Sequence, residues 1–165
     1  MKIVSRFVRS LYRLTEPGPL PIFVTQPLLD LVLHRIMRRR TGLFARMGAR
    51  AGAVFLIDIT DLPIFFVLKA DPQHPVMEAW SRRHLPSHDA RIKGAFSTMF
   101  RLLDGQLDGD AVFFSRELVI TGDTEAVVCL ANSLDDVDGS IGEDLLALIP
   151  PPLRHTVRRI GHLPT

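Results

Sequence analysis

The sequence predicts an α+β protein in which helices pack on one face of an antiparallel sheet of about five strands. Two observations carry this prediction. Apolar residues alternate with a period of two just after residue 51, and they recur at helical spacing after residues 96 and 123. The apolar runs between residues 51 and 80 are separated by short turns, which connect antiparallel neighbours rather than parallel ones.

The chain has 165 residues, 47 % of them hydrophobic and 23 % charged, which suits one domain with a real core. We divide it into a basic amphipathic helical segment at 1–50, a central domain at 51–138 and a helical tail at 139–165. No run of about 18 uncharged apolar residues is present, so no membrane-spanning helix is expected. The single cysteine, Cys129, excludes an internal disulfide framework and is expected to be a buried structural thiol.

Charge is distributed unevenly along the chain. Residues 1–50 carry ten Lys or Arg and two acids, whereas residues 104–144 carry eleven Asp or Glu and one Arg. This indicates a basic pole and an acidic pole, unless the two neutralise each other within the fold. Residues 1–14 place apolar side chains on one helical face, which is typical of a helix on an anionic membrane or of a helix packed on the domain. They do not read as a secretory signal, because charges recur throughout.

A second helix is expected to begin at Pro27, a residue favoured in the first helical turn, and to end in three arginines. Leu28, Leu31, Val32 and Ile36 form its expected apolar face. The arginines fit simple capping or a patch that attracts lipid headgroups, and no nucleic-acid motif accompanies them. The residues that we expect at a membrane surface are Lys2, Arg6, Arg9, Arg13, Arg38, Arg39 and Arg40.

The central domain begins with strand patterns. Residues 55–60 alternate, with Phe55, Ile57 and Ile59 on one face, and residues 64–68 are apolar on both faces. Residues 76–80 form a third expected strand, and residues 91–93 a short edge or closing strand. A helix follows, in which Phe96, Met99, Phe100 and Leu103 share the inner face.

The second half of the central domain is predicted to be a strand that is followed directly by a helix. The strand is expected over residues 111–121 and ends at Gly122. Asp123 is the expected N-cap of a helix whose apolar stripe contains Val127, Leu130, Ala131 and Leu134.

The sequence contains no recognisable catalytic or metal-binding pattern. His84 and His88 are separated by Pro86, so no helix supports them as a metal pair. Residues 104–115 imitate a calcium loop but end in Ser115, where a bidentate Glu is needed. No nucleophile elbow or nucleotide-binding glycine loop occurs. We therefore expect no catalytic residue, no metal and no cofactor.

The segment FFSRELVITGDTE at residues 113–125 resembles the end of a sterol-carrier-type lipid-binding domain. The order and spacing of its residues are similar to those of one branch, the UbiT family of accessory factors of oxygen-independent ubiquinone biosynthesis. The resemblance runs roughly from Val54 to Asp136 and is strongest after Phe96. General members carry a glycine where this chain has Arg116, and this departure matches the UbiT branch better.

The sequence patterns alone do not separate a hollow core from a packed one, and a packed core is the commoner arrangement. The resemblance implies that the sheet and helices enclose an apolar lipid cavity. The residues expected to line the cavity are Phe55, Ile57, Phe66, Phe96, Met99, Phe100, Phe113, Phe114 and Val127.

The implied function is that of a non-catalytic accessory factor that binds or presents polyprenylated intermediates of ubiquinone biosynthesis. Expected partners are an isoprenoid or phospholipid ligand, an anionic membrane surface and the oxygen-independent ubiquinone hydroxylases, with no nucleic acid. The expected location is the cytoplasm, peripherally on the inner membrane. Alternatives are a generic phospholipid or fatty-acyl carrier, a protein-interaction scaffold at the membrane surface, or a small hydrolase with an unrecognised nucleophile.

Overall fold

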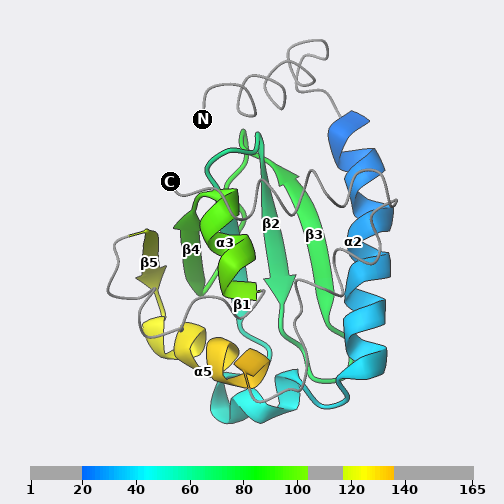
Figure 1. Cartoon of the computed structure of the whole chain (residues 1–165), viewed down its shortest axis with the longest axis vertical. Helices are drawn as coiled ribbons and strands as arrows, with labels where there is room; N and C mark the ends of the chain where they lie inside the picture. The colour runs from blue at the N-terminus through cyan, green and yellow to red at the C-terminus, as the bar shows by residue number, and fades with distance from the viewer. Residues whose placement is uncertain (1–19, 104–116, 136–165) are drawn as a thin grey trace.

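A five-stranded sheet with helices against it forms the body of the protein in the computed structural model, which describes residues 20–103 and 117–135 (Figure 1). The strands lie in the order β3-β2-β1-β4-β5. Their bounds are β1 (Val54–Ile59), β2 (Ile64–Lys69), β3 (Val76–Ser81), β4 (Ala90–Gly94) and β5 (Leu118–Gly122). The helical elements are α2 (Leu20–Arg39), the 3₁₀ segment η1 (Phe44–Arg50), α3 (Phe96–Leu103) and α5 (Thr124–Asp135).

The predicted α+β class is confirmed, and all but one of the strand pairs are antiparallel. The exception is β1 with β4, which pair in parallel with Ile57 opposite Ile92. The connection at residues 82–89 has to carry the chain from β3 past β2 and β1 to reach β4. The prediction of residues 91–93 as an edge strand is therefore wrong, because β4 lies between β1 and β5. Local patterning does not specify which distant strand becomes a neighbour.

The first described helix begins earlier than predicted. Helix α2 starts at Leu20, so Pro27 lies in its interior rather than in its first turn. A proline there removes one backbone donor, a loss that tertiary packing offsets here because α2 packs along edge strand β3 (Figure 1). The predicted end of the helix is close to the observed one, with Arg38 and Arg39 in the last turn.

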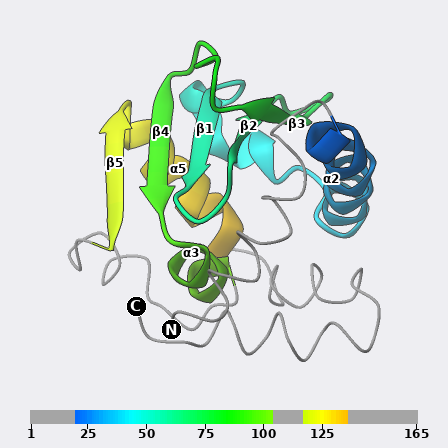
Figure 2. The same ribbon diagram turned by 90° about the horizontal axis from the view of Figure 1, so that it is seen from above.

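Strand alternation sorts the side chains of the sheet onto two faces. Phe55, Ile57 and Ile59 of β1 point to the face that α3 and α5 cover, and we call this the helix-covered face (Figure 2). Leu56 and Asp58 point to the opposite face, where Leu56 packs with Phe65 and Val67 of β2. Strand β2 is thus buried on both faces, as its continuous apolar run predicts.

The junction between β5 and α5 has the predicted geometry. Gly122 ends β5 with a φ of 86°, and a Cβ atom there would lie 2.2 Å from the carbonyl oxygen of Asp89. Asp123 caps α5, since its Oδ1 accepts a 3.0 Å hydrogen bond from the Ala126 amide. Its Oδ2 also accepts from Arg50 of η1 at 2.5 Å. The Gly-Asp pair therefore joins β5, β4 and η1 to the start of α5.

Several predicted features lie outside the described residues. They are the helix at 1–14, most of the strand predicted before Leu118, the imitated calcium loop and the tail at 139–165. The division into segments at 1–50, 51–138 and 139–165 stays a prediction.

Candidate functional site

The helix-covered face of the sheet carries two apolar clusters. The α5 cluster contains the fully buried Phe55 of β1 and lies among the sheet, η1, α5 and the C-terminal half of α2. The α3 cluster contains Phe66 and Met99, and it lies among the sheet, α3 and the inner face of α2. Buried members of the α5 cluster are Leu33, Leu43, Phe44, Met47, Phe55, Leu68, Ala70, Ala90, Ala126, Val127 and Leu130. Buried members of the α3 cluster are Leu29, Ile59, Ile64, Phe66, Ala79, Met99 and Leu118.

Between the two clusters the burial is incomplete. Ile57, Met77 and Ile92 contact both clusters, yet all three are only partly buried. Ile57 lies in the middle of the central strand, between Phe55 and Ile59, which are both buried. A close-packed core normally buries the middle of a sheet best. We call Ile57, Met77 and Ile92 the central apolar strip.

The predicted cavity residues converge on this region where they are described. Phe55 and Val127 belong to the α5 cluster, Phe66 and Met99 belong to the α3 cluster, and Ile57 contacts both. Phe96 packs at the margin of the α3 cluster. Its ring stacks on the buried Phe100 with centroids 6.0 Å apart. Phe113 and Phe114 lie outside the described residues, and the role of all nine as a cavity lining remains a prediction.

Sequence reasoning did not single out Met77, Ile92 or Leu29. Ile92 belongs to the short edge or closing strand predicted at residues 91–93. Its partner on β1, Ile57, follows only from the parallel pairing. We expected the helix to begin at Pro27 and Leu28 to face the core. Leu28 is instead 47 % exposed, and the next residue, Leu29, faces the core. The i, i+4 relation of Leu29 and Leu33, both buried, was the available signal for the inner face.

The predicted basic surface residues do not share one environment. Arg38 and Arg39 are exposed at the end of α2, whereas Arg40 is 5 % exposed. Burial of Arg40 removes it from the surface patch, since a guanidinium facing the protein interior does not contact headgroups. Lys2, Arg6, Arg9 and Arg13 lie outside the described residues.

The opposite face of the sheet holds a charged network around Asp58. Its carboxylate is fully buried and accepts from Arg82 at 2.5 Å and from Arg91. Burial raises the pKa of Asp58, but the hydrogen bonds from Arg91 and Arg82 outweigh burial and hold its pKa below the usual value. The Arg82 guanidinium also lies over the Phe65 ring, 4.6 Å from its centroid. Asp58 thus stays ionised, with its charge balanced by the two arginines, and does not have the raised pKa of a proton donor.

The described parts of the chain contain neither a candidate metal site nor a candidate membrane-spanning helix. No group of three or more His, Cys, Asp and Glu there could hold a metal ion. None of the helices within residues 20–103 and 117–135 has the length and apolar character needed to cross a membrane.

Solved structures of other proteins have the same architecture. The solved structure of a "UbiJ-SCP2 Ubiquinone synthesis protein" superposes with a TM-score of 0.52 at 20 % identity, covering 73 % of this chain and 93 % of the other. A crystal structure of sterol carrier protein 2 gives a TM-score of 0.52 at 10 % identity, covering 73 % and 94 %. These likenesses show the shared fold. A search of curated proteins gave no match.

A family model decides the wider relationship. The model described as "SCP-2 sterol transfer family" matches residues 33–135, which include β1 to β5, α3 and α5. Apart from Leu29, the match therefore contains the buried residues of both apolar clusters, and it contains the Gly122–Asp123 junction. More than half of the chain is covered, and the chain belongs to the SCP-2 sterol transfer family.

Proposed function

We propose that this chain is a non-catalytic lipid-binding accessory factor of oxygen-independent ubiquinone biosynthesis, which binds or presents polyprenylated intermediates. Membership of the SCP-2 sterol transfer family supports lipid binding. The resemblance of residues 113–125 to the UbiT branch supports the pathway, as does the fold shared with a protein named for ubiquinone synthesis.

The observation that carries the proposal is the central apolar strip. Ile57, Met77 and Ile92 are partly buried in the middle of the helix-covered face, where apolar surface remains for a ligand to cover. Covering apolar surface contributes about 25 cal/mol per Å², so an isoprenoid tail is held without any specific chemistry. Polyprenylated intermediates are nearly insoluble in water, and ring-modifying enzymes need them sheltered or presented.

The ligand is identified by native mass spectrometry of the full chain after gentle, detergent-free purification, followed by lipid extraction. We expect a bound isoprenoid quinone precursor. A bound phospholipid or fatty acid alone would favour the generic carrier. A clean apo mass would favour the scaffold, which the separated basic and acidic residues of the sequence also suit.

The pathway is tested by deleting the gene and measuring ubiquinone in cells grown with and without oxygen. We expect ubiquinone to fall only in the anaerobic cells, because the factor as proposed serves the oxygen-independent route. Unchanged anaerobic ubiquinone would remove the pathway claim. In this proposal the factor works in the cytoplasm, peripherally on the inner membrane, beside the oxygen-independent hydroxylases.

A further inference from the structure

We propose that α2 is a hinged cover over the central apolar strip, and that its N-terminal half moves away from β3 when a lipid enters or leaves. The inference rests on the proposed function, since it concerns access to the same lipid site. It adds the element that moves, the hinge about which it turns and the contact that keeps it closed.

The chain that follows α2 is fixed in the body of the protein. Leu43 of the turn after α2, and Phe44 and Met47 of η1, are at most 3 % exposed, and all three belong to the α5 cluster. Leu33, in the C-terminal half of α2, packs in the same cluster. The C-terminal end of α2 is therefore the fixed end of the helix.

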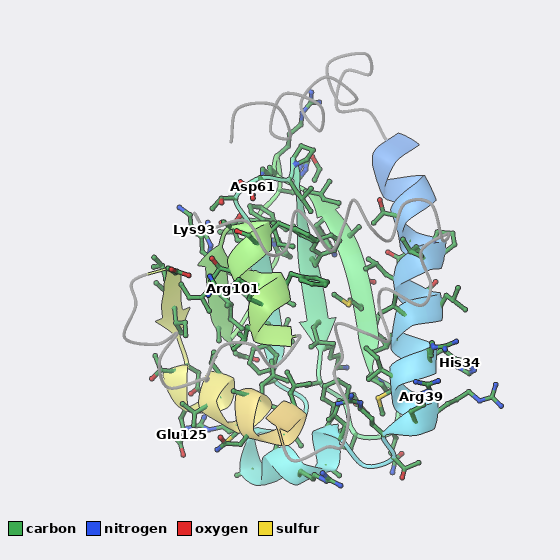
Figure 3. All side chains as sticks on the ribbon, viewed as in Figure 1. His34, Arg39, Asp61, Lys93, Arg101 and Glu125 are labelled. Atoms are coloured by element: carbon green, nitrogen blue, oxygen red, sulfur yellow. The ribbon has the colours of Figure 1, made fainter. Side chains whose placement is uncertain are left out.

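The N-terminal half of α2 is held to the sheet by Leu29 and Gln26. Leu29 packs in the α3 cluster and is 9 % exposed, so its burial is shallower than that of the segment after α2. Gln26 bonds the edge of β3 at the Met77 carbonyl and the Ala79 amide. His34 and Arg39 project from α2 away from the sheet, so the inner face is the one that holds this helix to the sheet (Figure 3).

A glycine lies between the moving half of α2 and the fixed segment. Gly42 follows α2 and precedes η1 with a φ of 75°, and a Cβ atom there would meet nothing within 4 Å. Glycine adopts this left-handed conformation readily, and its backbone angles change without a side chain striking a neighbour. Gly42 is therefore the hinge that we assign to α2.

The other two helices on the sheet are held more tightly. Thr98 of α3 and Ala126 of α5 are at most 1 % exposed. The first turn of α5 is also bound to η1, because Asp123 accepts from Arg50. Movement of α2 requires fewer deeply buried side chains to leave the core, so α2 is the element that opens.

Movement of α2 would uncover the central apolar strip at its β3 end. Met77 belongs to this strip, and its carbonyl is one of the groups that Gln26 bonds. Leu29 packs in the cluster that Met77 and Ile57 contact. Opening therefore exposes Leu29 and the strip together, and an entering lipid tail covers the same apolar surface again.

A reversible cross-link between α2 and β3 tests the inference. Gln26→Cys/Glu78→Cys is made in the full-length Cys129→Ser protein, since Glu78 is the exposed residue between the two groups that Gln26 bonds. A bismaleimide with a disulfide in its linker joins the two cysteines, and a reductant cleaves it. The control is Lys93→Cys/Val119→Cys, which joins paired, exposed positions of β4 and β5 across the molecule from α2 (Figure 3).

Stopped-flow fluorescence then measures lipid uptake after copurified lipid has been removed. The probes are an anthraniloyl ester of farnesol and cis-parinaric acid, so that an isoprenoid and an acyl tail are both examined. We expect the α2–β3 cross-link to slow uptake about tenfold or more, and the reductant to restore it. Gln26→Ala without a cross-link should speed uptake about fivefold, because the hydrogen bonds that keep α2 closed are lost. Asn132→Ala, which removes an exposed amide from α5, should leave uptake unchanged.

The cross-linked proteins decide between a moving and a fixed α2. Slow uptake in the α2–β3 protein alone, restored by the reductant, supports the inference. Wild-type uptake in that protein, equal slowing by the β4–β5 cross-link, or slow uptake that persists after cleavage would overturn it.

Spin labels on two exposed positions, Leu28 of α2 and Val128 of α5, report the movement without a lipid. If neither probe binds the wild-type protein, the proposed function fails and the labels decide the inference. A second, longer distance that the α2–β3 cross-link abolishes supports a moving α2, and a single distance overturns it. Probe uptake that no cross-link slows would leave the proposed function intact and remove the hinged cover.

Discussion

Asp58 is a charged residue that the fold buries completely. It lies in the central strand with no solvent exposure, and Arg82 and Arg91 keep 34 % and 31 % side-chain exposure while they bond it. The pair of arginines comes from β4 and from the connection before it, so the network fastens that crossing segment onto the face of β1 and β2. One carboxylate thus stabilises the parallel pairing that local patterning does not encode.

Replacing Asp58 with Asn is expected to lower the free energy of unfolding by about 2–4 kcal/mol at pH 7. Removal of the Asp58 carboxylate leaves the charges of Arg82 and Arg91 without a partner. Because both arginines are partly exposed, water solvates them, and the loss of stability falls toward the lower part of the range usual for a broken buried ion pair. Urea unfolding gives the value. Glu78→Gln is the control, because Glu78 is an exposed acid on the same face. Equal stability of the two variants would show that the network contributes no more than a surface pair.

The pH dependence of the same network has a defined sign. The folded pKa of Asp58 lies below its unfolded value of about 3.9, so its contribution is present above that pH. It is lost as the pH falls through the folded pKa, because protonation removes the charge that the arginines bind. The stability gap between wild type and Asp58→Asn should therefore shrink below about pH 4. A gap that stays constant from pH 7 to pH 3 would contradict this assignment.

A side chain at Gly122 or at Gly52 would carry the cost of a left-handed backbone conformation, and at Gly122 it would also carry the cost of a steric clash. Both have a left-handed φ, 86° and 87°, but a Cβ at Gly52 meets nothing within 4 Å, whereas at Gly122 it meets the Asp89 backbone. Gly52→Ala should cost about 1 kcal/mol from conformation alone. Gly122→Ala should cost at least about 2 kcal/mol more, since the strand end must move from β4. Thermal unfolding of both proteins measures the difference, and equal losses would rule out the backbone contact as its cause.

Gln26 shows how a helix protects the edge of a sheet. Its Nε2 donates to the Met77 carbonyl at 2.9 Å and its Oε1 accepts from the Ala79 amide at 3.1 Å. Both groups belong to edge strand β3, so the side-chain amide takes the place of a neighbouring strand. This contact anchors α2 along the edge of the sheet.

Gln26→Ala should expose the Ala79 amide to exchange, and Gln26→Glu should preserve part of its protection because a carboxylate still accepts that bond. The two groups left unpaired in Gln26→Ala cost about 1–2 kcal/mol. Hydrogen exchange followed by NMR at Ala79 gives the order wild type, Glu variant, Ala variant. Identical exchange in all three proteins would show that the edge is protected by other means.

The predicted elements succeeded where the signal was local. Asp123 caps α5 as predicted, because a cap depends on residues within one turn. The start of α2 and the place of β4 were missed for the opposite reason. Pro27 is tolerated only because α2 packs on β3, and β4 is internal only because it pairs with a strand more than 30 residues away. The buried state of Asp58 likewise depends on arginines that follow it by 24 and 33 residues.

The fold as a whole places apolar surface on both sides of α2. Its inner face completes the α3 cluster, while Leu28 and Leu31 face outward. On the helix-covered face, buried residues of the two clusters lie on either side of the partly buried central apolar strip. The protein is therefore expected to tolerate added volume in the strip and to resist it in the clusters.

Ile92→Phe tests whether the central apolar strip is a ligand site or a loosely packed core. If a lipid tail normally covers Ile92, the larger side chain should fill part of that space, so the protein should retain less copurified lipid while its melting temperature stays unchanged. If the region is close-packed, overpacking should cost about 1–3 kcal/mol whatever the lipid content. Ala126→Val is the control, because Ala126 is fully buried in the α5 cluster and should lose stability in either case. Lipid extraction and thermal unfolding of the same preparations supply both readouts. A destabilised Ile92→Phe protein that keeps its lipid would place the ligand elsewhere than on the helix-covered face.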